Sequence, residues 1–418
     1  MQRSAILVGL ILLIFFVISL LTNILGPIIP EVIKSYQLSL TAAAFLPFAF
    51  FVAYGVMSIP AGMLIEAFKE KPVLLVSFFI AFLGAFCFAL FPVYRVAISS
   101  LFVIGAGMAM LQVAINPLLR VAGGEEHYAF NSTFAQVIFG AASFISPQIY
   151  SYLVQNLQSP PSDPNAFLRL MASLVPPSLP WVSVYWVFAA TSLLMVLLIF
   201  FFRFPVVKRT EEEVVGTWAA HRLLFSRKLV WLYFFSIFAY VGSEQGVANW
   251  ISQFLSAYHH YDPQTTGATA VSWFWGLMTI GCLLGMGLLK LFDSRHVLIG
   301  FAAAAMICLT LALFGPAPVS RVAFPLMGFC ASVMWPVIFS LALNSVEEHH
   351  GSFSGILCTG IMGGAMVPLI IGRLGDWFGL RAGMLFLYLT IGWILAVGFW
   401  SRPIIRNETI RARKERSA

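Results

Sequence analysis

The amino-acid sequence predicts an all-α membrane protein with twelve membrane-spanning helices, arranged as two six-helix bundles related by a pseudo-twofold axis. Hydrophobic residues make up 60% of the 418 residues, and charged residues make up only 10%. In a typical soluble domain about 25% of the residues are charged. The mean hydropathy of +0.91 points the same way. A soluble core would leave too much apolar surface uncovered, so lipid is the expected solvent for most of the chain.

Apolar segments long enough to cross the ~30 Å hydrocarbon core of a bilayer recur along the whole chain. They lie at 5–33, 40–68, 72–93, 95–122, 128–157, 182–203, 226–258, 264–292, 296–315, 318–346, 351–376 and 379–402. The first segment resembles a signal peptide, but it continues without a small-residue cleavage site into more membrane sequence. It is therefore interpreted as the first span.

Two polar segments interrupt this pattern. Residues 204–225, which include VVKRTEEE, lie midway along the chain and are expected to form a cytoplasmic linker. This linker would join an N-terminal bundle, 1–203, to a C-terminal bundle, 226–402, which is followed by a basic cytoplasmic tail, 403–418. The second polar segment, 158–181, is rich in Pro and Ser and is expected to face outside.

The distribution of Lys and Arg predicts the orientation of the spans. These residues concentrate in the linker, the tail and the loops on the same side as the N-terminus. Cytoplasmic loops carry such an excess, so both termini are predicted to be cytoplasmic in a multi-pass protein of the inner or plasma membrane. The net charge of +7 is accordingly attributed to orientation and to anionic headgroups rather than to nucleic-acid binding.

The two halves of the chain repeat. The segments GEEHYAF and VEEHHGSF end at Phe130 and Phe353, and the offset of 223 residues between them also places Gly140 on Gly363. A parallel repeat of six helices is a known transporter architecture. The acidic and histidine residues of these two segments recur at matching inner loops, so contacts between domains are expected there rather than a metal site.

Polar side chains inside the predicted spans are informative because each must be satisfied without water. Seven amides are the candidate substrate-binding residues: Asn23, Gln112, Asn116, Asn131, Gln136, Gln245 and Asn249. Two pairs of them are four residues apart and therefore share a helix face. Amides both donate and accept, which suits a hydroxyl-rich neutral ligand, and Trp275 or Trp335 would stack on a sugar ring. The alternative is that the amides join helices and the tryptophans pack.

Glu244 is the carboxylate that stands out within a predicted span. An ionised, unpaired carboxylate is costly at that depth, so Glu244 must be protonated, paired or hydrated. It is the candidate group for coupling to H⁺ or Na⁺, and a structural acid bonded to the backbone is the alternative. No other cofactor and no metal are expected. Gly26–Pro27 and Asn116–Pro117 are expected to let their helices bend.

Six segments, taken in order, resemble the sugar branch of the major facilitator superfamily, the fucose and glucose/galactose permeases. The resemblance covers nearly the whole chain, and it implies a major facilitator fold and a sugar-like cargo. The segments are LQVAINPLL (111–119), FNSTFAQVIFGAASFISP (130–147), AYVGSEQGVANW (239–250), WFWGLMTIG (273–281), SVMWPVIFSLAL (332–343) and GGAMVPLIIGRLGDW (363–377).

Three positions depart from that family. The fucose permease has Asp in the first span where this chain has Asn23, and Glu in the fourth span where this chain has Gln112. Those acids are implicated in proton coupling and sugar handling, and an amide cannot release a proton. Cys282 replaces the Arg usual in the eighth span. The resemblance therefore supports the fold and the cargo better than it supports fucose or proton symport.

We therefore expect a secondary transporter, not an enzyme, that moves a sugar or related polyhydroxylated molecule by alternating access, with or without a coupled cation. It is expected to be a monomer whose partners are a monosaccharide and the lipid bilayer.

Export of other apolar or cationic compounds is an alternative, which the small number of acids in the spans disfavours. A non-transporting membrane sensor or an intramembrane enzyme is a further alternative. No appended signalling domain, nucleophile–base set or metal-ligand set is expected.

Overall fold

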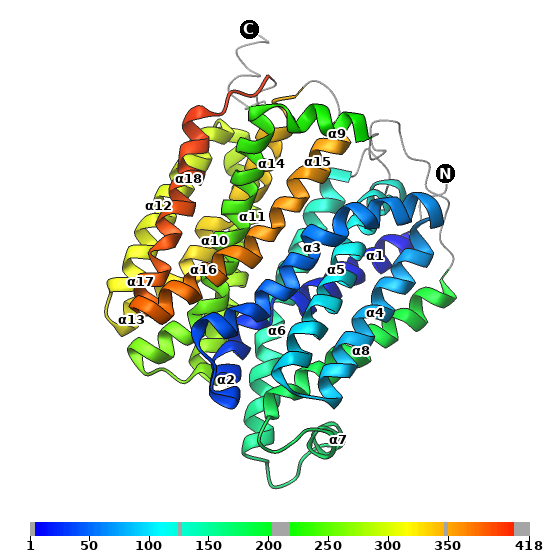
Figure 1. Ribbon diagram of the computed structural model, residues 1–418, viewed down its shortest axis with the longest axis vertical. Helices are drawn as coiled ribbons and strands as arrows, with labels where there is room; N and C mark the ends of the chain where they lie inside the picture. The colour runs from blue at the N-terminus through cyan, green and yellow to red at the C-terminus, as the bar shows by residue number, and fades with distance from the viewer. Residues whose placement is uncertain (1–4, 124–127, 203–217, 347–349, 405–418) are drawn as a thin grey trace.

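The computed structural model describes residues 5–123, 128–202, 218–346 and 350–404, and within them the chain is helical (Figure 1). The helices of the first half are α1 (Ala5–Thr22), α2 (Leu25–Tyr36), α3 (Leu40–Phe68), α4 (Glu70–Leu90), α5 (Tyr94–Gly123), α6 (Tyr128–Gln158), α7 (Ala166–Leu174), the short turn η2 (Pro180–Val182) and α8 (Ser183–Phe201).

The second half begins with α9 and ends with α18. Its helices are α9 (Trp218–Phe225), α10 (Lys228–His259), η4 (Pro263–Gly267), α11 (Ala268–Leu291), α12 (Ser294–Phe314), α13 (Ala317–Ala331), α14 (Met334–Leu343), α15 (His350–Thr359), η5 (Gly360–Met362), α16 (Gly363–Phe378), α17 (Leu380–Met384) and α18 (Phe386–Trp400).

Eleven helical segments in the described part of the chain are long and apolar enough to cross a membrane. They overlap eleven of the twelve predicted spans; the exception is the segment that contains α10. With 32 residues, α10 is about 48 Å long, which exceeds the thickness of the hydrocarbon core. It carries Glu244, Gln245 and Asn249, which lower its mean hydropathy, and most of its residues are buried by other helices. The predicted count of twelve spans therefore requires that α10 also crosses the membrane.

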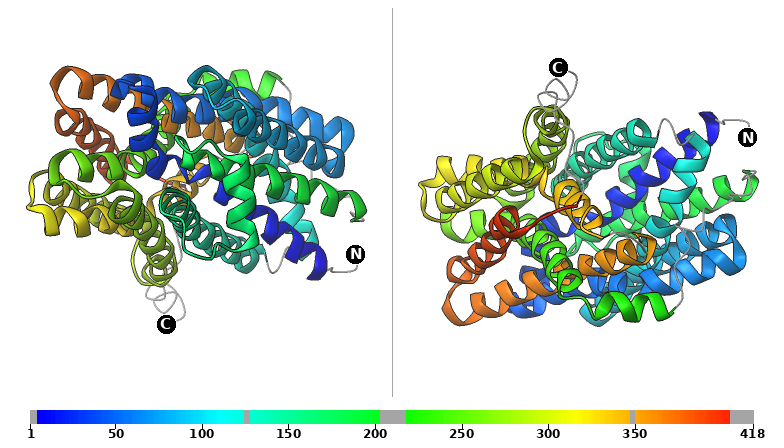
Figure 2. Two further views of the ribbon diagram at one scale, coloured as in Figure 1. Left: turned by 90° about the horizontal axis from the view of Figure 1, so that it is seen from below. Right: turned by 90° about the horizontal axis from the view of Figure 1, so that it is seen from above.

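Two hydrophobic clusters form the core, one in each half. The first draws almost all its buried side chains from residues 7–199, and the second draws almost all of its own from residues 224–397. Views along the long axis show the two groups of helices side by side (Figure 2). The exact boundaries predicted for the bundles stay a prediction, because much of 204–225 and of 403–418 lies outside the described residues.

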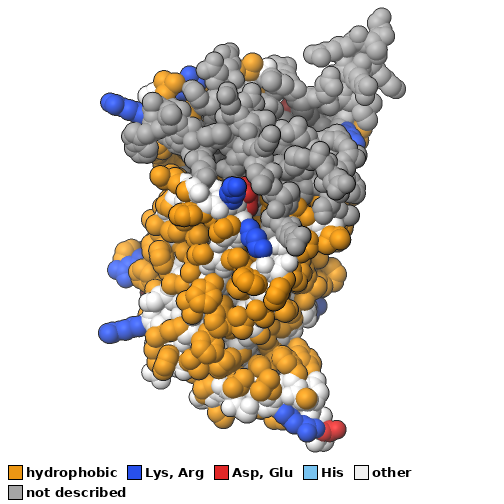
Figure 3. Space-filling view, turned by 90° about the vertical axis from the view of Figure 1, so that its right-hand side faces the viewer, with side chains coloured by type: hydrophobic (Ala, Val, Ile, Leu, Met, Phe, Trp, Pro, Cys, Tyr) orange, Lys and Arg blue, Asp and Glu red, His pale blue; other side chains and the backbone are white. Residues whose placement is uncertain are grey.

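The outer surface of the helices is apolar. Outside the area drawn in grey, Figure 3 shows one face covered mainly by hydrophobic side chains, with few charged ones among them. Large side chains such as Phe201, Leu389 and Phe399 are 80%, 67% and 65% exposed. In water such a surface would drive aggregation, whereas in a bilayer it is the lipid-facing surface.

The halves meet mainly along two helix pairs, α3 with α16 and α6 with α11. The repeat exchanges these pairs, because α3 corresponds to α11 and α16 corresponds to α6. Small residues bring the helices close. Gly140 of α6 lies directly against the Thr279 side chain of α11, and Gly364 of α16 lies against Phe51 of α3. A self-complementary interface of this kind is what a pseudo-twofold axis produces.

Hydrogen bonds join the halves toward the end of the bundle where α2 ends. Gln264 of η4 donates from Nε2 to Glu31 Oε1 of α2 at 2.9 Å, and Gln148 of α6 donates to Ser272 Oγ of α11 at 3.0 Å. The start of α1 and the end of α18 lie at the opposite end (Figure 1).

Several segments differ from the sequence expectation. The first span is interrupted at Asn23–Ile24, three residues before Gly26–Pro27, whereas α5 continues as a helix through Asn116–Pro117. The loop predicted at 158–181 contains α7, which Asn165 caps by accepting from the Leu168 N–H at 2.8 Å. Short amphipathic helices are easily missed because a few buried side chains stabilise them.

Candidate functional site

The interruption between α1 and α2 places a buried amide at the contact with α6. Asn23 is 5% exposed, and its Nδ2 donates to Ser143 Oγ of α6 at 2.8 Å. Ser19, one turn earlier on α1, contacts the same Ser143 hydroxyl at 2.6 Å and donates to the Phe139 carbonyl at 2.5 Å. The carbonyl oxygen Oδ1 of Asn23 is buried without a partner among the described residues.

Five buried polar atoms of the second half are also without a partner in the described part of the chain; three of them are Nε2 of His259, Nε of Arg381 and Oγ of Ser401. The other two belong to residues that the sequence singled out: they are Nδ2 of Asn249 and Nε1 of Trp275, each on a residue that is 3% exposed. An unsatisfied buried polar atom typically costs about 1–3 kcal/mol. These atoms therefore favour a ligand that accepts and donates hydrogen bonds.

Close contacts bring the helices that carry these residues together across the two halves. Gly26, three residues after Asn23, lies against the backbone of Ala248 and Asn249 on α10. Thr279 donates to the Trp275 carbonyl at 2.9 Å, and its side chain lies against Gly140 of α6, one turn before Ser143. The structure thus brings Asn23, Asn249 and Trp275 to the region where α2, α6, α10 and α11 meet.

The other predicted amides are placed as follows. Gln245 is buried, and its side chain approaches Gly364 at the junction of α10, α16 and α3. Gln112 is half-buried on α5, and Gln136 is exposed on α6. Asn116 and Asn131 belong to α5 and α6, but their side chains lie outside the described residues.

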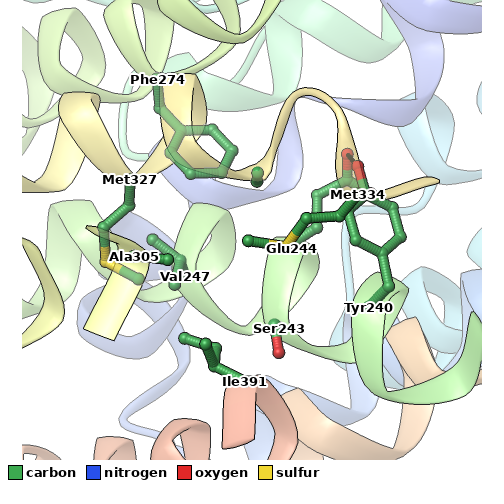
Figure 4. Close-up of a pocket in the computed structure, with 10 residues that line it drawn as sticks. Tyr240, Ser243, Glu244, Val247, Phe274, Ala305, Met327, Met334 and Ile391 are labelled. Carbon is green, nitrogen blue, oxygen red and sulfur yellow. Dashed lines mark hydrogen bonds between the residues drawn. The ribbon is translucent and has the colours of Figure 1, made fainter. Parts of the chain in front are cut away.

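Glu244 points into a different environment from its neighbour Gln245. It lines a cavity of about 20 Å³ inside the second half, together with Tyr240, Met334 and Phe274 (Figure 4). The Tyr240 hydroxyl donates to Glu244 Oε1 at 3.1 Å. A cavity of this size holds about one water, whereas small-molecule sites have volumes of roughly 300–1,000 Å³. Glu244 is therefore set apart from the amides rather than among them.

Trp335 of α14 lies on the same side of α10 as Glu244. Its ring lies 5.9 Å from that of Tyr240 and stacks on Phe339 at 5.7 Å. Trp275 is the tryptophan that lies near the amides, and its ring meets Phe274 edge-on at 5.2 Å. The two predicted stacking residues therefore occupy separate parts of the second half.

Cys282 has a structural contact. Its thiol donates to the Ser332 carbonyl at 3.3 Å, at the interruption between α13 and α14. Carbonyl groups freed at a helix interruption need a donor in the membrane. The thiol supplies one without introducing a charge.

Sequence reasoning missed Ser19, Ser143 and Glu31. Ser19 lies four residues before Asn23 and so shares its helix face, a signal that was available in the sequence. The contribution of Ser143 depends on the packing of α6 against α1, which no local pattern reports. Glu31 is a carboxylate within the first predicted span; it is 8% exposed and accepts from Gln264 at 2.9 Å.

Two repeated helical bundles, an apolar outer surface and unpaired polar atoms where the bundles meet define a multi-pass membrane transporter of the secondary class. The chain belongs to the Major Facilitator Superfamily, whose family model matches residues 11–368. This membership confirms the predicted family and fold, and it agrees with a transporter rather than an enzyme.

Curated relatives extend over most of the chain. A glucose/galactose transporter of Brucella abortus is 29% identical over 400 residues, which cover 92% of this chain and 92% of that protein. An L-fucose-proton symporter of Escherichia coli is 26% identical over 385 residues, covering 87% of this chain and 86% of that protein. The sequence therefore resembles both permeases named in the expectation.

Solved structures share the fold. A variant of the Escherichia coli fucose–proton symporter FucP matches with a TM-score of 0.68 and 23% identity, covering 96% of this chain and all of that one. The nucleoside transporter NupG matches with a TM-score of 0.69 and 13% identity, covering 95% of this chain and 98% of that one. At these identities the likeness concerns the arrangement of the helices.

Proposed function

We propose that the chain transports a neutral monosaccharide by alternating access, with the substrate bound where α2, α6, α10 and α11 meet. The observation that carries this proposal is the set of unpaired buried polar atoms on Asn23, Asn249 and Trp275. A sugar hydroxyl both donates and accepts, so one ligand would satisfy the Asn23 carbonyl and the two donors.

The chemistry of these atoms favours a neutral sugar. All three belong to uncharged side chains, whereas a sugar phosphate or acid sugar is best held by Arg or Lys. The indole of Trp275 adds an apolar face of the kind that packs on a pyranose ring. The relatives named for glucose, galactose and fucose support the same substrate class.

Alternating access would proceed by rocking of the two halves about this site. The α3–α16 and α6–α11 pairs form the surfaces that would separate and close. The hydrogen bonds that α3 donates to Asp376 and that Gln264 donates to Glu31 hold the halves together at one end, so they belong to the state in which that end is closed.

We also propose that Glu244 couples sugar transport to protons. The Escherichia coli relative is named a proton symporter, whereas Asn23 and Gln112 are amides and cannot titrate. The cavity beside Glu244 offers few free oxygens, because the Ser243 hydroxyl already contacts the Ala239 carbonyl and the Thr390 hydroxyl at 2.8 and 2.7 Å. A proton needs fewer oxygen ligands than Na⁺, so H⁺ is the proposed coupling ion.

We further propose that the transporter acts as a monomer with both termini in the cytoplasm, and that residues 1–203 and 226–402 move as the two bundles. The excess of Lys and Arg on the side of the N-terminus supports this orientation.

Uptake by the purified full-length protein in proteoliposomes tests the proposal. Labelled D-glucose, D-galactose and L-fucose are compared with glucose 6-phosphate, with and without an imposed pH gradient. Saturable uptake of at least one neutral sugar is expected, and the sugar phosphate should not compete. No saturable uptake of any neutral sugar would contradict the sugar assignment. Equal sugar uptake with and without the pH gradient would show that transport is not coupled to protons.

A further inference from the structure

Two cysteines of the second half lie in contact with each other, and sugar transport does not explain the contact. Cys308 belongs to α12 and Cys330 lies near the end of α13, and their Sγ atoms are 3.9 Å apart. The two residues are 22 positions apart in the chain, and neither belongs to a CxxC pair. The packing of α12 on α13 therefore places one thiol beside the other.

The distance between the two sulfurs suits a reaction between them. A disulfide has an S–S bond of about 2.05 Å, so the Sγ atoms of Cys308 and Cys330, now 3.9 Å apart, have to approach by about 2 Å. A thiol is a weak hydrogen-bond donor and a weak acceptor, so the contact satisfies one thiol hydrogen in an apolar region. The same contact also brings each sulfur within reach of the other.

Both thiols are accessible from the surface of the second half. Cys308 is half-buried. Cys330 is 6% exposed, and it lines a groove of about 330 Å³ together with Phe329 and Ala304. Most of the residues that line this groove are apolar, so an ion is disfavoured there and a small uncharged reagent is not. An uncharged oxidant therefore meets Cys308 first, and Cys330 lies next to it.

The pair of thiols lies beside the cavity that contains Glu244. The wall of that cavity includes Ala305 of α12, three residues before Cys308, and Ala331 of α13, which follows Cys330 directly (Figure 4). The cavity of about 20 Å³ has room for about one water, so proton exchange with Glu244 requires the wall to open. A covalent bond between α12 and α13 would hold two of the wall helices together.

We propose that Cys308 and Cys330 are an oxidation site, at which an uncharged peroxide joins the two sulfurs as a disulfide that restrains the wall of the Glu244 cavity. The Cys308 sulfur attacks one oxygen of hydrogen peroxide and the O–O bond breaks. The products are a sulfenic acid and one water, which takes the Cys308 proton. The Cys330 sulfur then attacks the sulfenic sulfur, and the hydroxyl group leaves with the Cys330 proton as a second water.

The reaction is balanced, because the two thiols lose two electrons and two protons and one peroxide takes up both. The disulfide carries no charge, so the product suits an apolar region. The effect on Glu244 rests on the proposed function of this chain, whereas formation of the disulfide does not.

Peptide mapping by mass spectrometry of the full-length protein in proteoliposomes tests whether the disulfide forms. Hydrogen peroxide is added until Cys87, an exposed thiol on α4, is oxidised, which shows that the oxidant has reached the protein. We expect a peptide that contains Cys308 linked to one that contains Cys330, and a thiol reductant should separate them. Absence of this linked pair after oxidation of Cys87 would overturn the proposal.

Sugar uptake by the oxidised protein tests the restraint. Peroxide should abolish the uptake that a pH gradient drives in the wild-type chain, while exchange of sugar at equal pH remains, and the reductant should restore the uptake. Cys308→Ala should keep gradient-driven uptake after the same treatment. Cys87→Ala is the matched control and should lose gradient-driven uptake as the wild-type chain does. Thermal stability checks that each variant is folded.

Two outcomes of the uptake measurement would overturn the restraint. One is full gradient-driven uptake by wild-type protein in which Cys308 and Cys330 are linked. The other is equal loss of uptake in peroxide-treated Cys308→Ala, which would assign the effect to another residue. If the chain transports no sugar, the proposed function fails, and peptide mapping still decides whether the two sulfurs join.

Discussion

The carboxylate of Asp376, near the end of α16, accepts a hydrogen bond from the backbone N–H of Thr41 in the first turn of α3 at 2.9 Å. It also accepts from the Leu40 N–H at 2.8 Å and from the Thr41 hydroxyl. A side chain of the second half thus caps the first turn of a helix in the first half. A negative charge at this position is stabilised by the free amides and by the helix dipole.

Replacing this charge should loosen one end of the transporter. We expect Asp376→Asn to shift the population toward states open at that end by about tenfold, because a hydrogen bond to a charged group contributes about 1.5–3 kcal/mol. Spin labels at Gln37 and His260, one exposed residue from each half, should report a larger fraction of long distances. The labelled chain needs its native cysteines replaced.

Asp163→Asn is the control for this measurement. Asp163 is 92% exposed in its ion pair with Arg169, and neither residue joins the halves. A distance distribution that is the same in Asp376→Asn as in the wild-type chain would show that the cap does not hold this end closed.

Removing the Asn23 side chain should weaken sugar binding. We expect Asn23→Ala to raise the KM for uptake about tenfold, because both the carbonyl that awaits a ligand and the bond to Ser143 are lost. Concentration-dependent uptake in proteoliposomes gives the KM. Asn156→Ala is the control, since the Asn156 amide donates to the Tyr152 carbonyl one turn away on the same helix and lies outside the proposed site. Equal KM values for the two variants would remove Asn23 from the binding site.

Glu244 should be needed for sugar accumulation driven by a pH gradient, and it should not be needed for exchange of sugar across the membrane. In Glu244→Gln, a pH gradient should no longer drive sugar uptake, while exchange of labelled for unlabelled sugar at equal pH should remain. The physical reason is that the Glu244 cavity is separate from the amides and too small for a sugar. Glu244→Asp keeps a titratable group and should retain part of the accumulation. Gradient-driven accumulation by Glu244→Gln would mean that another group carries the proton.

The contact between Gly140 and Thr279 should tolerate no added atom on the glycine. Gly140→Ala would place a methyl group on the Thr279 side chain and should destabilise the contact of α6 with α11 by about 1–3 kcal/mol. A lower melting temperature in detergent and slower uptake are the expected results. Adding Thr279→Gly to the same chain should restore both. Failure of the second substitution to restore either property would assign the loss to α6 itself.

The positions of the helices were largely predictable from the sequence. The predicted segment 40–68 coincides with α3, Leu40–Phe68, and the predicted segment 128–157 nearly coincides with α6, Tyr128–Gln158. The backbone must satisfy its own hydrogen bonds in lipid, so a long apolar segment has little choice but a helix. Interruptions were less predictable, because the one at Asn23 lies before the Gly26–Pro27 pair that suggested it.

Only part of the candidate site was predictable. Asn23, Asn249 and Trp275 were candidates because of their residue types, and the structure places them where the halves meet. The separation of Glu244 from Gln245 could not be predicted, since adjacent residues on a helix differ in direction by about 100° and only packing decides what each direction meets. The same holds for Trp335, which lies beside Tyr240 rather than near the amides.

The sequence by itself determined that lipid surrounds most of the chain and where the helices lie, because both follow from its apolar composition. It also determined the two repeated halves, because the repeat is visible in the order of the residues. The tertiary structure decided which helices meet, which polar atoms remain unpaired and which carboxylate caps which helix. Those relations join residues far apart in the chain, such as Thr41 with Asp376 and Asn23 with Ser143. They depend on how the helices pack against one another, which hydropathy does not record.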